Sequence, residues 1–183
     1  LILPSLYSEL EGDALKNIVS CLSNVKYLNH ITIGLDKADK SEFIKAKKFF
    51  SNLNQPHSVI WNDSPEMTKL DSDFKKLGIA PNQSGKGKNV WYCMGYTYSR
   101  NEAGSVALHD CDITTYNREL LARLVYPVSN PHFNYEFCKG YYPRIREGTL
   151  SGRVTRLLVT PLLKTFKKVL GHRDYIEFID VFR

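Results

Sequence analysis

The sequence of 183 residues contains no long hydrophobic run and no closely spaced cysteine pair. No apolar stretch approaches the roughly 18 residues that a membrane-spanning helix needs. The opening LILPSLYSEL has neither the basic leader nor the apolar core of a signal peptide. The four cysteines form no C-x-x-C motif, which argues against a zinc knuckle or a disulfide framework: Cys21, Cys93, Cys111 and Cys138. We therefore expect a cytoplasmic protein with no membrane span and with reduced thiols.

Two glycine-rich phosphate-binding signatures are also missing, since neither G-x-x-x-x-G-K-[ST] nor G-x-G-x-x-G occurs. With 43% hydrophobic and 24% charged residues the composition is that of a globular domain. The formal net charge of +6 indicates an anionic partner. Because the basic residues are scattered and form no nucleic-acid-binding signature, a small phosphorylated ligand accounts for this charge as well as nucleic acid does.

The chain shows no internal repeat and no composition shift typical of an interdomain linker. It begins without Met in a strand-like run and stops at YIEFIDVFR without a polar tail. We therefore expect a single domain over residues 1–183 that is truncated at its C-terminus.

Short apolar runs alternate with helical patterns along the chain. The runs LILPSLY, HITIGLD, SVIWND, SVALHDCD and NYEFCKGYY each end in polar residues, which is typical of strands buried in a parallel sheet. Between them, apolar residues recur at helical spacing over residues 14–22, 43–50 and 120–125. This alternation predicts right-handed βαβ units and thus an α/β fold, a Rossmann-like sheet with helices on both faces.

Carboxylates stand where the expected strands end. Asp110 and Asp112 close the fourth run, and Glu9 and Asp36 follow the first two. Ligands of open α/β sheets bind at the carboxyl ends of the strands. Carboxylates gathered there repel one another unless a cation intervenes, and oxygen ligands suit Mg²⁺ or Mn²⁺. The alternative is that D-x-D is a capped turn before a helix that starts near Asn117.

The stretch SGKGKNVW is a second candidate element. Gly85, Lys86 and Gly87 are expected to form a basic loop immediately before a helix, where free amides and a lysine bind phosphate. A solvated basic loop without a ligand is the alternative. Taken together with the aspartates, the loop predicts a site for a diphosphate and a divalent cation.

A third element is SGRVTRLLVTPLLKTF. Gly152, Arg153 and Thr155 are expected in the first turn of a helix that Pro161 kinks. Arginine, a hydroxyl and free amides make a cradle for phosphate or carboxylate, to which Lys139 upstream adds positive charge. A capped amphipathic helix with a surface arginine is the alternative.

In chain order, the segments LPSLYSE, GLDKAD, SGKGKNVW, LHDCDI, CKGYYPR and GRVTRLLVTPLL resemble motifs of GT-A glycosyltransferases of the glucosyl-3-phosphoglycerate synthase type. The resemblance spans nearly the whole chain and implies a GT-A nucleotide-sugar-binding sheet. It implies a retaining, metal-dependent transfer of a hexose, glucose, from UDP-glucose or GDP-glucose. The implied acceptor is a small phosphorylated or carboxylate molecule such as 3-phosphoglycerate, and the implied cofactor is Mg²⁺ or Mn²⁺.

Carried over position by position, the resemblance implies three groups of site residues. Asp112 is the expected direct metal ligand, and Gly152, Arg153 and Thr155 are expected to hold the acceptor. No catalytic nucleophile is identified. The family's later G-E-[FY] element and metal-completing histidine do not occur here, so part of the catalytic machinery is expected to be missing. The residues expected to bind the donor nucleotide sugar are Pro4, Ser5, Leu6, Glu9, Asp36, Lys86, Asp110 and Cys111.

Two other functions remain as alternatives. A sugar-nucleotide pyrophosphorylase shares the sheet and the use of metal and lysine, but normally has a glycine-rich opening loop where this chain has PSLYSELEG. A basic nucleic-acid-binding module predicts an affinity that falls steeply with salt and needs no Mn²⁺. The preferred interpretation, a glycosyltransferase, has no nucleic-acid partner. It leaves the oligomeric state open, with a homodimer as one alternative.

Overall fold

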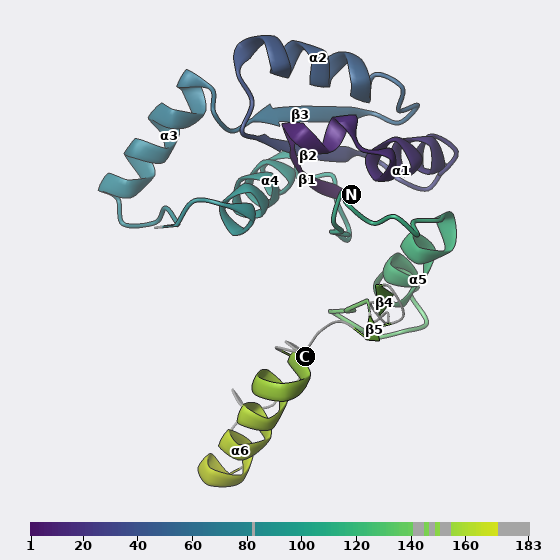
Figure 1. Ribbon diagram of the computed structural model, residues 1–183, viewed down its shortest axis with the longest axis vertical. Helices are drawn as coiled ribbons and strands as arrows, with labels where there is room; N and C mark the ends of the chain where they lie inside the picture. Colours follow the sequence, from purple (N-terminus) through teal and green to yellow (C-terminus); the bar gives the residue numbers. More distant parts are fainter. Residues whose placement is uncertain (82, 141–144, 147–148, 151–154, 172–183) are drawn as a thin grey trace. The chain divides into compact units, whose positions relative to one another are not determined.

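The computed structural model describes residues 1–81, 83–140, 145–146, 149–150 and 155–171 (Figure 1). The chain divides into two compact units, Leu1–Glu136 and Phe137–Arg183. The expected single domain over residues 1–183 therefore stays a prediction.

The described residues of the first unit form three strands and five α-helices. Its strands are β1 (Ile2–Leu6), β2 (Ile31–Asp36) and β3 (His57–Trp61). Its α-helices are α1 (Asp13–Ser23), α2 (Lys40–Phe50), α3 (Pro65–Lys76), α4 (Lys86–Arg100) and α5 (Arg118–Ser129), and a 3-10 helix (Tyr7–Glu11) follows β1.

The three strands form one parallel sheet with β2 at its centre. Beside β1, on the side away from β2, Leu108 forms a parallel bridge with Ile2, and the Ile2 amide donates to the Ala107 carbonyl at 2.8 Å. The chain thus builds outward from β1 to β3 and then returns to the other side of β1. This reversal is a topological switch point, the place where open α/β sheets bind ligands.

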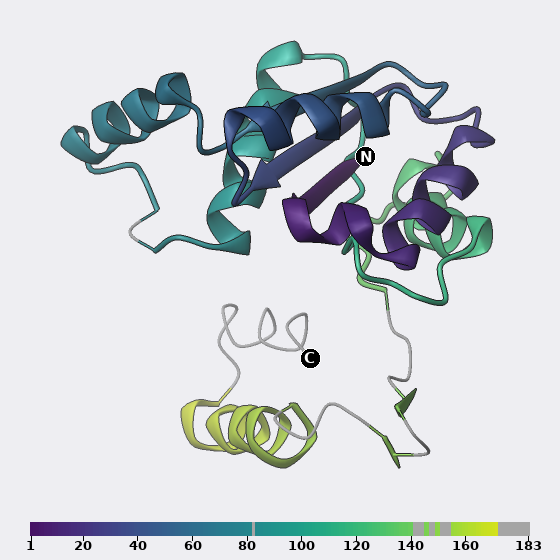
Figure 2. The same ribbon diagram turned by 45° about the horizontal axis from the view of Figure 1, so that its top comes forward.

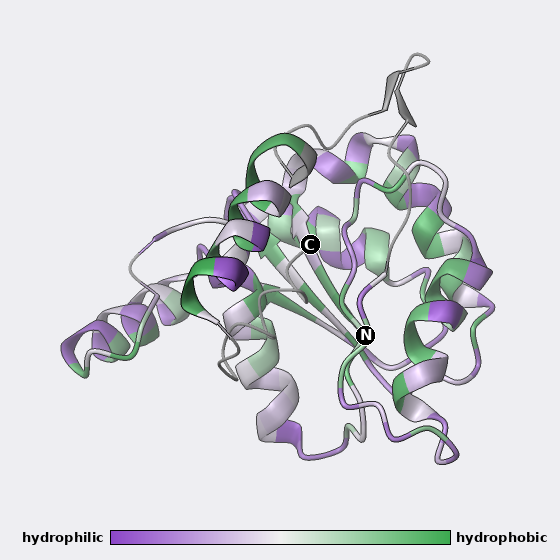
Figure 3. Cartoon of the chain, turned by 90° about the horizontal axis from the view of Figure 1, so that it is seen from below, coloured by the Kyte–Doolittle hydropathy of each residue, from purple (hydrophilic) through white to green (hydrophobic). Residues whose placement is uncertain are grey.

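Side chains of β2 alternate between two helical layers. Ile31, Ile33 and Leu35 belong to a buried apolar cluster that includes α1 and α2. Facing the other way, Gly34 contacts α4. Figure 1 shows α2 and α4 on opposite sides of the sheet, and Figure 3 shows the strands coloured largely as hydrophobic. The expected α/β fold with helices on both faces is confirmed.

Helix α4 lies directly against β2 because residue 34 is glycine. The Asn89 side-chain amide donates to the Gly34 carbonyl at 2.9 Å. A Cβ atom on Gly34 would lie 1.8 Å from Asn89 Oδ1 and 2.5 Å from Cys93 Sγ. This close approach fixes the position of α4, whose first turn reaches the carboxyl edge of the sheet.

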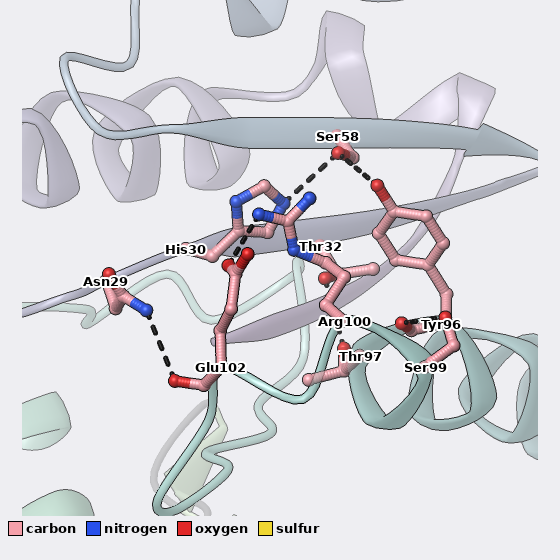
Figure 4. Close-up of polar contacts among 9 residues, drawn as sticks. All are labelled: Asn29, His30, Thr32, Ser58, Tyr96, Thr97, Ser99, Arg100 and Glu102. Carbon is pink, nitrogen blue, oxygen red and sulfur yellow. Dashed lines mark hydrogen bonds and ion pairs between the residues drawn. The ribbon is translucent and has the colours of Figure 1, made fainter.

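A polar network joins α4 to the opposite, N-terminal edge of the sheet (Figure 4). The Ser58 hydroxyl lies 3.1 Å from His30 Nε2 and 2.8 Å from the Tyr96 hydroxyl. Arg100, at the end of α4, donates to Glu102 at 2.6 Å, and its guanidinium lies over the Tyr96 ring. These contacts hold the C-terminal half of α4 against the starts of β2 and β3.

This network predicts a pH-dependent stability. Burial, and then the Arg100 guanidinium, lower the pKa of His30. The unfolded chain therefore binds the proton more readily than the folded protein does. Neutral His30 contributes to the free energy of unfolding, and this contribution is complete above about pH 6.5, the ordinary pKa of histidine. It is lost as the pH falls toward the lower pKa of His30 in the folded protein. We expect urea unfolding to show a smaller loss of stability from about pH 7.5 to about pH 5 in His30→Gln than in the wild type. His132→Gln, at an exposed position, serves as the control. Equal pH dependence in all three proteins would contradict the assignment.

Most expected elements occur where the sequence pattern indicated. The runs at residues 1–7 and 30–36 contain β1 and β2, the run at 58–63 covers β3 except for its first residue, and the helical patterns correspond to α1, α2 and α5. Asn117 caps α5, accepting from the Leu120 amide at 2.9 Å. Lys86 and Gly87 are the first residues of α4 rather than part of the loop before it. Gly85 supplies the cap, at φ +121°.

Two expected strands are wrong in the described residues. Residues 105–112 make a single bridge at Leu108, because only this point of the run lies against β1. Residues 134–140 form no strand, while residues 141–142 lie outside the described residues. Nearly all of 134–140 is exposed, and apolar alternation yields a strand only where a neighbouring strand pairs with it.

The second unit holds the third sequence element. Its described elements are an antiparallel pair, β4 (Ile145–Arg146) and β5 (Thr149–Leu150), a π-helix (Thr155–Val159) and α6 (Thr160–Leu170). The helix changes from π to α at Thr160, one residue before Pro161, which lies in the first turn of α6. Within the described ranges, no helix combines the length and the apolar character needed to cross a membrane.

Candidate functional site

A cavity of about 770 Å³ lies at the carboxyl ends of β1 and β2 and beside the D-x-D segment. Its walls come from β1, the ends of β2 and β3, α3, the first turns of α4 and the segment after Leu108. The donor and metal residues expected from the sequence all line it, namely Pro4, Ser5, Leu6, Glu9, Asp36, Lys86, Asp110, Cys111 and Asp112.

The end of β1 is held by a carboxylate. Glu9 accepts hydrogen bonds from the Ser5 hydroxyl at 3.1 Å and from the Leu6 amide at 3.0 Å. Ser5 is 1% exposed, so this carboxylate also satisfies a buried hydroxyl. The two bonds fix Glu9 at the cavity wall.

At the end of β2, two amide side chains orient Asp36. Asn62 donates to Asp36 at 2.7 Å, and Asn89 lies close enough to interact with the same carboxylate. Burial raises the pKa of Asp36, while hydrogen bonds from Asn62 and Asn89 oppose this rise. The next residue, Lys37, has φ +56°, an uncommon conformation for a side chain other than glycine, and lines the cavity.

The first turn of α4 meets the D-x-D segment. Lys86 forms an ion pair with Asp110 through its Nζ and Oδ1 atoms. Both side chains are partly exposed toward solvent, at 54% and 36%. This contact brings the basic and acidic sequence elements together at one wall of the cavity.

The D-x-D segment presents its two carboxylates differently. Asp112 is exposed and makes no hydrogen bond or ion pair with another described residue, whereas Asp110 is paired with Lys86. Between them Cys111 is buried, and burial raises the pKa of its thiol. Before them His109 is buried against Tyr116, with ring centroids 4.8 Å apart. The buried side chains anchor the segment and leave Asp112 directed to solvent.

Sequence reasoning missed the cavity wall between β3 and α4. Asn62 and Asp63 follow β3 as polar residues follow the other strands, so the same signal was present there. Helix α3 was not predicted, although Ser64 as N-cap followed by Pro65 is a recognised start signal. The missed residues that line the cavity are Lys37, Asn62, Asp63, Met67, Thr68, Asp71, Ser84, Lys88, Asn89 and Tyr92.

The ionisable lining of the cavity is acidic although the whole chain is basic. An anionic ligand in such a site needs a cation beside it, because carboxylates and phosphates repel one another. The lining holds six carboxylates and three ammonium groups, namely Glu9, Asp36, Asp63, Asp71, Asp110 and Asp112 against Lys37, Lys86 and Lys88.

The protein side chains alone offer a limited set of metal ligands. In the part of the chain that the structure describes, no group of three or more His, Cys, Asp or Glu side chains is arranged to hold a metal ion. Mg²⁺, however, is commonly bound by one or two carboxylates together with substrate phosphates and water. Asp112, with Asp110 one residue away, fits this kind of shared site.

The structure does not test the expected acceptor residues. Gly152 and Arg153 lie outside the described residues, and Thr155 is the first residue of the π-helix in the second unit. Their expected role stays a prediction.

A parallel sheet with a switch point beside β1, and a polar cavity at its carboxyl edge, define a Rossmann-like α/β protein. The chain is 44% identical over 183 residues to a glucosyl-3-phosphoglycerate synthase of Persephonella marina, and 38% identical over 186 residues to one of Methanococcoides burtonii. Both alignments cover 100% of this chain and 45% of the relative.

The chain is thus similar to glucosyl-3-phosphoglycerate synthases along its whole length, which confirms the resemblance of the motifs. It spans a little under half the length of these two relatives. No protein-family model matches the chain. The search of solved structures gives no significant match.

Proposed function

We propose that the chain carries the donor-binding part of a retaining glycosyltransferase. It would move glucose from a nucleotide diphosphate sugar to a small anionic acceptor such as 3-phosphoglycerate. The observation that carries this proposal is that nine residues assigned from the sequence line one cavity at the switch point of the sheet. The printed names of the two relatives support the same reaction. Because the chain spans 45% of each relative, the activity of the whole enzyme is part of the proposal.

The nucleoside end of the donor would lie near Glu9 and Asp36. Both carboxylates are held by neighbouring donors, so their positions are set before the ligand arrives. Carboxylate oxygens accept hydrogen bonds from ribose hydroxyls and from N–H groups of a base. Such preformed acceptors give orientation at a low cost in side-chain entropy.

The diphosphate would lie at the first turn of α4. The N-terminus of a helix carries partial positive charge and free amides, and Lys86 adds a full charge beside it. Negative charge grows on the leaving diphosphate as the glycosidic bond breaks. Lys86 and the first turn of α4 stabilise that charge in place.

A divalent cation, Mg²⁺ or Mn²⁺, would supply the remaining neutralisation of the diphosphate when bound. Asp112 is the residue proposed to hold it directly. Asp110, already paired with Lys86, keeps that lysine close to the same group. The surplus of carboxylates over lysines in the cavity supports a cation requirement.

The acceptor is proposed to bind at Gly152, Arg153 and Thr155, whose guanidinium, hydroxyl and amides suit a phosphate or carboxylate. Retention at the anomeric carbon follows from the family resemblance, and no nucleophile is assigned. A cytoplasmic location is part of the proposal, and the oligomeric state stays open, with a homodimer as one alternative.

Calorimetric titration of the chain with UDP-glucose and GDP-glucose, with Mn²⁺ and with a chelator, tests the proposal. We expect binding of a nucleotide sugar that requires the metal. A parallel titration with an oligonucleotide separates the nucleic-acid alternative, whose affinity falls steeply with salt and is independent of Mn²⁺. Oligonucleotide binding without nucleotide-sugar binding would overturn the proposed function.

A further inference from the structure

Helix α3 is attached to the rest of the first unit in an unusual way. None of its residues is buried, from Pro65 to Lys76. Figures 1 and 2 show it extending to one side of the sheet. In Figure 3 it is coloured mostly hydrophilic, with few hydrophobic segments. Apolar burial, the usual anchor of a surface helix, therefore contributes little to its position.

The same helix nevertheless forms a wall of the cavity. Met67, Thr68 and Asp71 all line it. A ligand that reaches Met67, Thr68 or Asp71 therefore contacts a helix that is weakly anchored to the core.

Asp71 makes the closest contacts between α3 and α4. Its Oδ1 atom accepts from Lys88 Nζ at 2.6 Å and from the Tyr92 hydroxyl at 2.7 Å. Its Oδ2 atom is 2.8 Å from Lys75 on α3 itself. The Asp71 side chain is 13% exposed, and the Lys75 and Lys88 ammonium groups hold its pKa well below the usual range. The carboxylate is thus charged and well paired at neutral pH.

One aromatic contact accompanies this cluster. Phe74, one turn after Asp71, meets the Trp91 ring edge to face with centroids 5.6 Å apart. Trp91 is 38% exposed, so this contact lies at the surface. Beyond α3 the chain turns at Gly78, with φ +71°.

We propose that α3 is a hinged wall of the cavity, latched to α4 through Asp71 and closing on a bound nucleotide sugar. The latch is inferred from the contacts of Asp71 and does not depend on the proposed function. The closing step does rest on the proposed function, because it needs a bound nucleotide sugar. A helix held by a charged cluster opens locally at a lower cost than a helix held by core packing. A ligand that touches Met67 and Thr68 adds contacts that exist in the closed state alone and shifts the population toward it.

Hydrogen exchange of the chain without ligand tests the latch. We expect Asp71→Asn to speed amide exchange across residues 66–76 about tenfold or more, because an amide replaces a carboxylate paired with two ammonium groups. Tyr92→Phe, which removes one donor and keeps the ring, should give a smaller increase in the same residues. The matched control is Asp73→Asn, on the same helix, whose partner Lys76 at 3.0 Å belongs to α3 itself. Equal exchange in Asp71→Asn and Asp73→Asn would overturn the latch.

Exchange with UDP-glucose or GDP-glucose and Mn²⁺ tests the closing step. We expect slower exchange both in residues 110–113 and in residues 66–76 of the wild type, with the second effect reduced in Asp71→Asn. Protection of residues 110–113 without any change in α3 would overturn the closing step while leaving the proposed function intact. If neither UDP-glucose nor GDP-glucose binds, the proposed function and the closing step are both overturned. The latch is then still decided by the ligand-free experiment.

Discussion

Replacing Gly34 by alanine is expected to lower the free energy of unfolding by about 3 kcal/mol. The added methyl would lie 1.8 Å from Asn89 Oδ1 and 2.5 Å from Cys93 Sγ, inside a buried contact between β2 and α4. Relieving this steric overlap requires the Asn89 side chain to move, which breaks its hydrogen bond to the Gly34 carbonyl. The cost therefore combines overpacking with an unsatisfied buried carbonyl.

Urea unfolding of Gly34→Ala and Gly95→Ala measures this effect with a matched control. Gly95 lies in α4, and a Cβ atom there meets no heavy atom within 4 Å. Alanine favours a helix interior by about 1 kcal/mol over glycine, so Gly95→Ala should be neutral or stabilising. A Gly34→Ala protein as stable as the wild type would show that α4 is free to move away from the sheet.

The second large effect concerns Asp112. Asp112→Asn is expected to lower the affinity for a nucleotide sugar in the presence of Mn²⁺ by about 100-fold, since loss of even an outer partner of a metal ligand costs 10–100-fold. Without metal, the variant and the wild type should bind equally weakly. The exposed position of Asp112 makes a loss of folding an improbable cause of such a result.

Calorimetry of the Asp112→Asn protein beside Asp73→Asn checks this expectation. Asp73 lies on α3, pairs with Lys76 and does not line the cavity, so its variant removes one negative charge without touching the site. If both variants bind with wild-type affinity in Mn²⁺, Asp112 is not a metal ligand.

The two predictions are linked through α4. Asn89 fixes this helix on β2, and Lys86 in its first turn reaches Asp110. A displacement caused by alanine at Gly34 would therefore also move Lys86 at the cavity. We expect Gly34→Ala to weaken nucleotide-sugar binding even under conditions in which it remains folded.

The sequence by itself determined the central strands and the residues that gather at their ends. Apolar runs at residues 1–7 and 30–36 contain β1 and β2, which are buried, and the run at 58–63 overlaps the half-buried β3, since each pattern is local. Glu9, Asp36 and Asp110 then fall near one another because parallel strands bring their carboxyl ends to the same edge. The Rossmann-like class and the strand-end residues of the cavity were therefore predictable without coordinates, whereas its wall between β3 and α4 was not predicted.

Only the tertiary structure decided which contacts join the elements. Asn89 meets Gly34 across 55 residues of chain, and Asp71 meets Lys88 across two helices. The fourth run is reduced to one bridge at Leu108 because pairing depends on a distant neighbour, β1. Hydrophobic periodicity reports the environment of a segment averaged over its turns, whereas a hydrogen bond or ion pair depends on two separate segments placed to within a fraction of an ångström. For this reason the strand-end residues were visible in the sequence, and the Gly34 contact and the Asp71 latch were not.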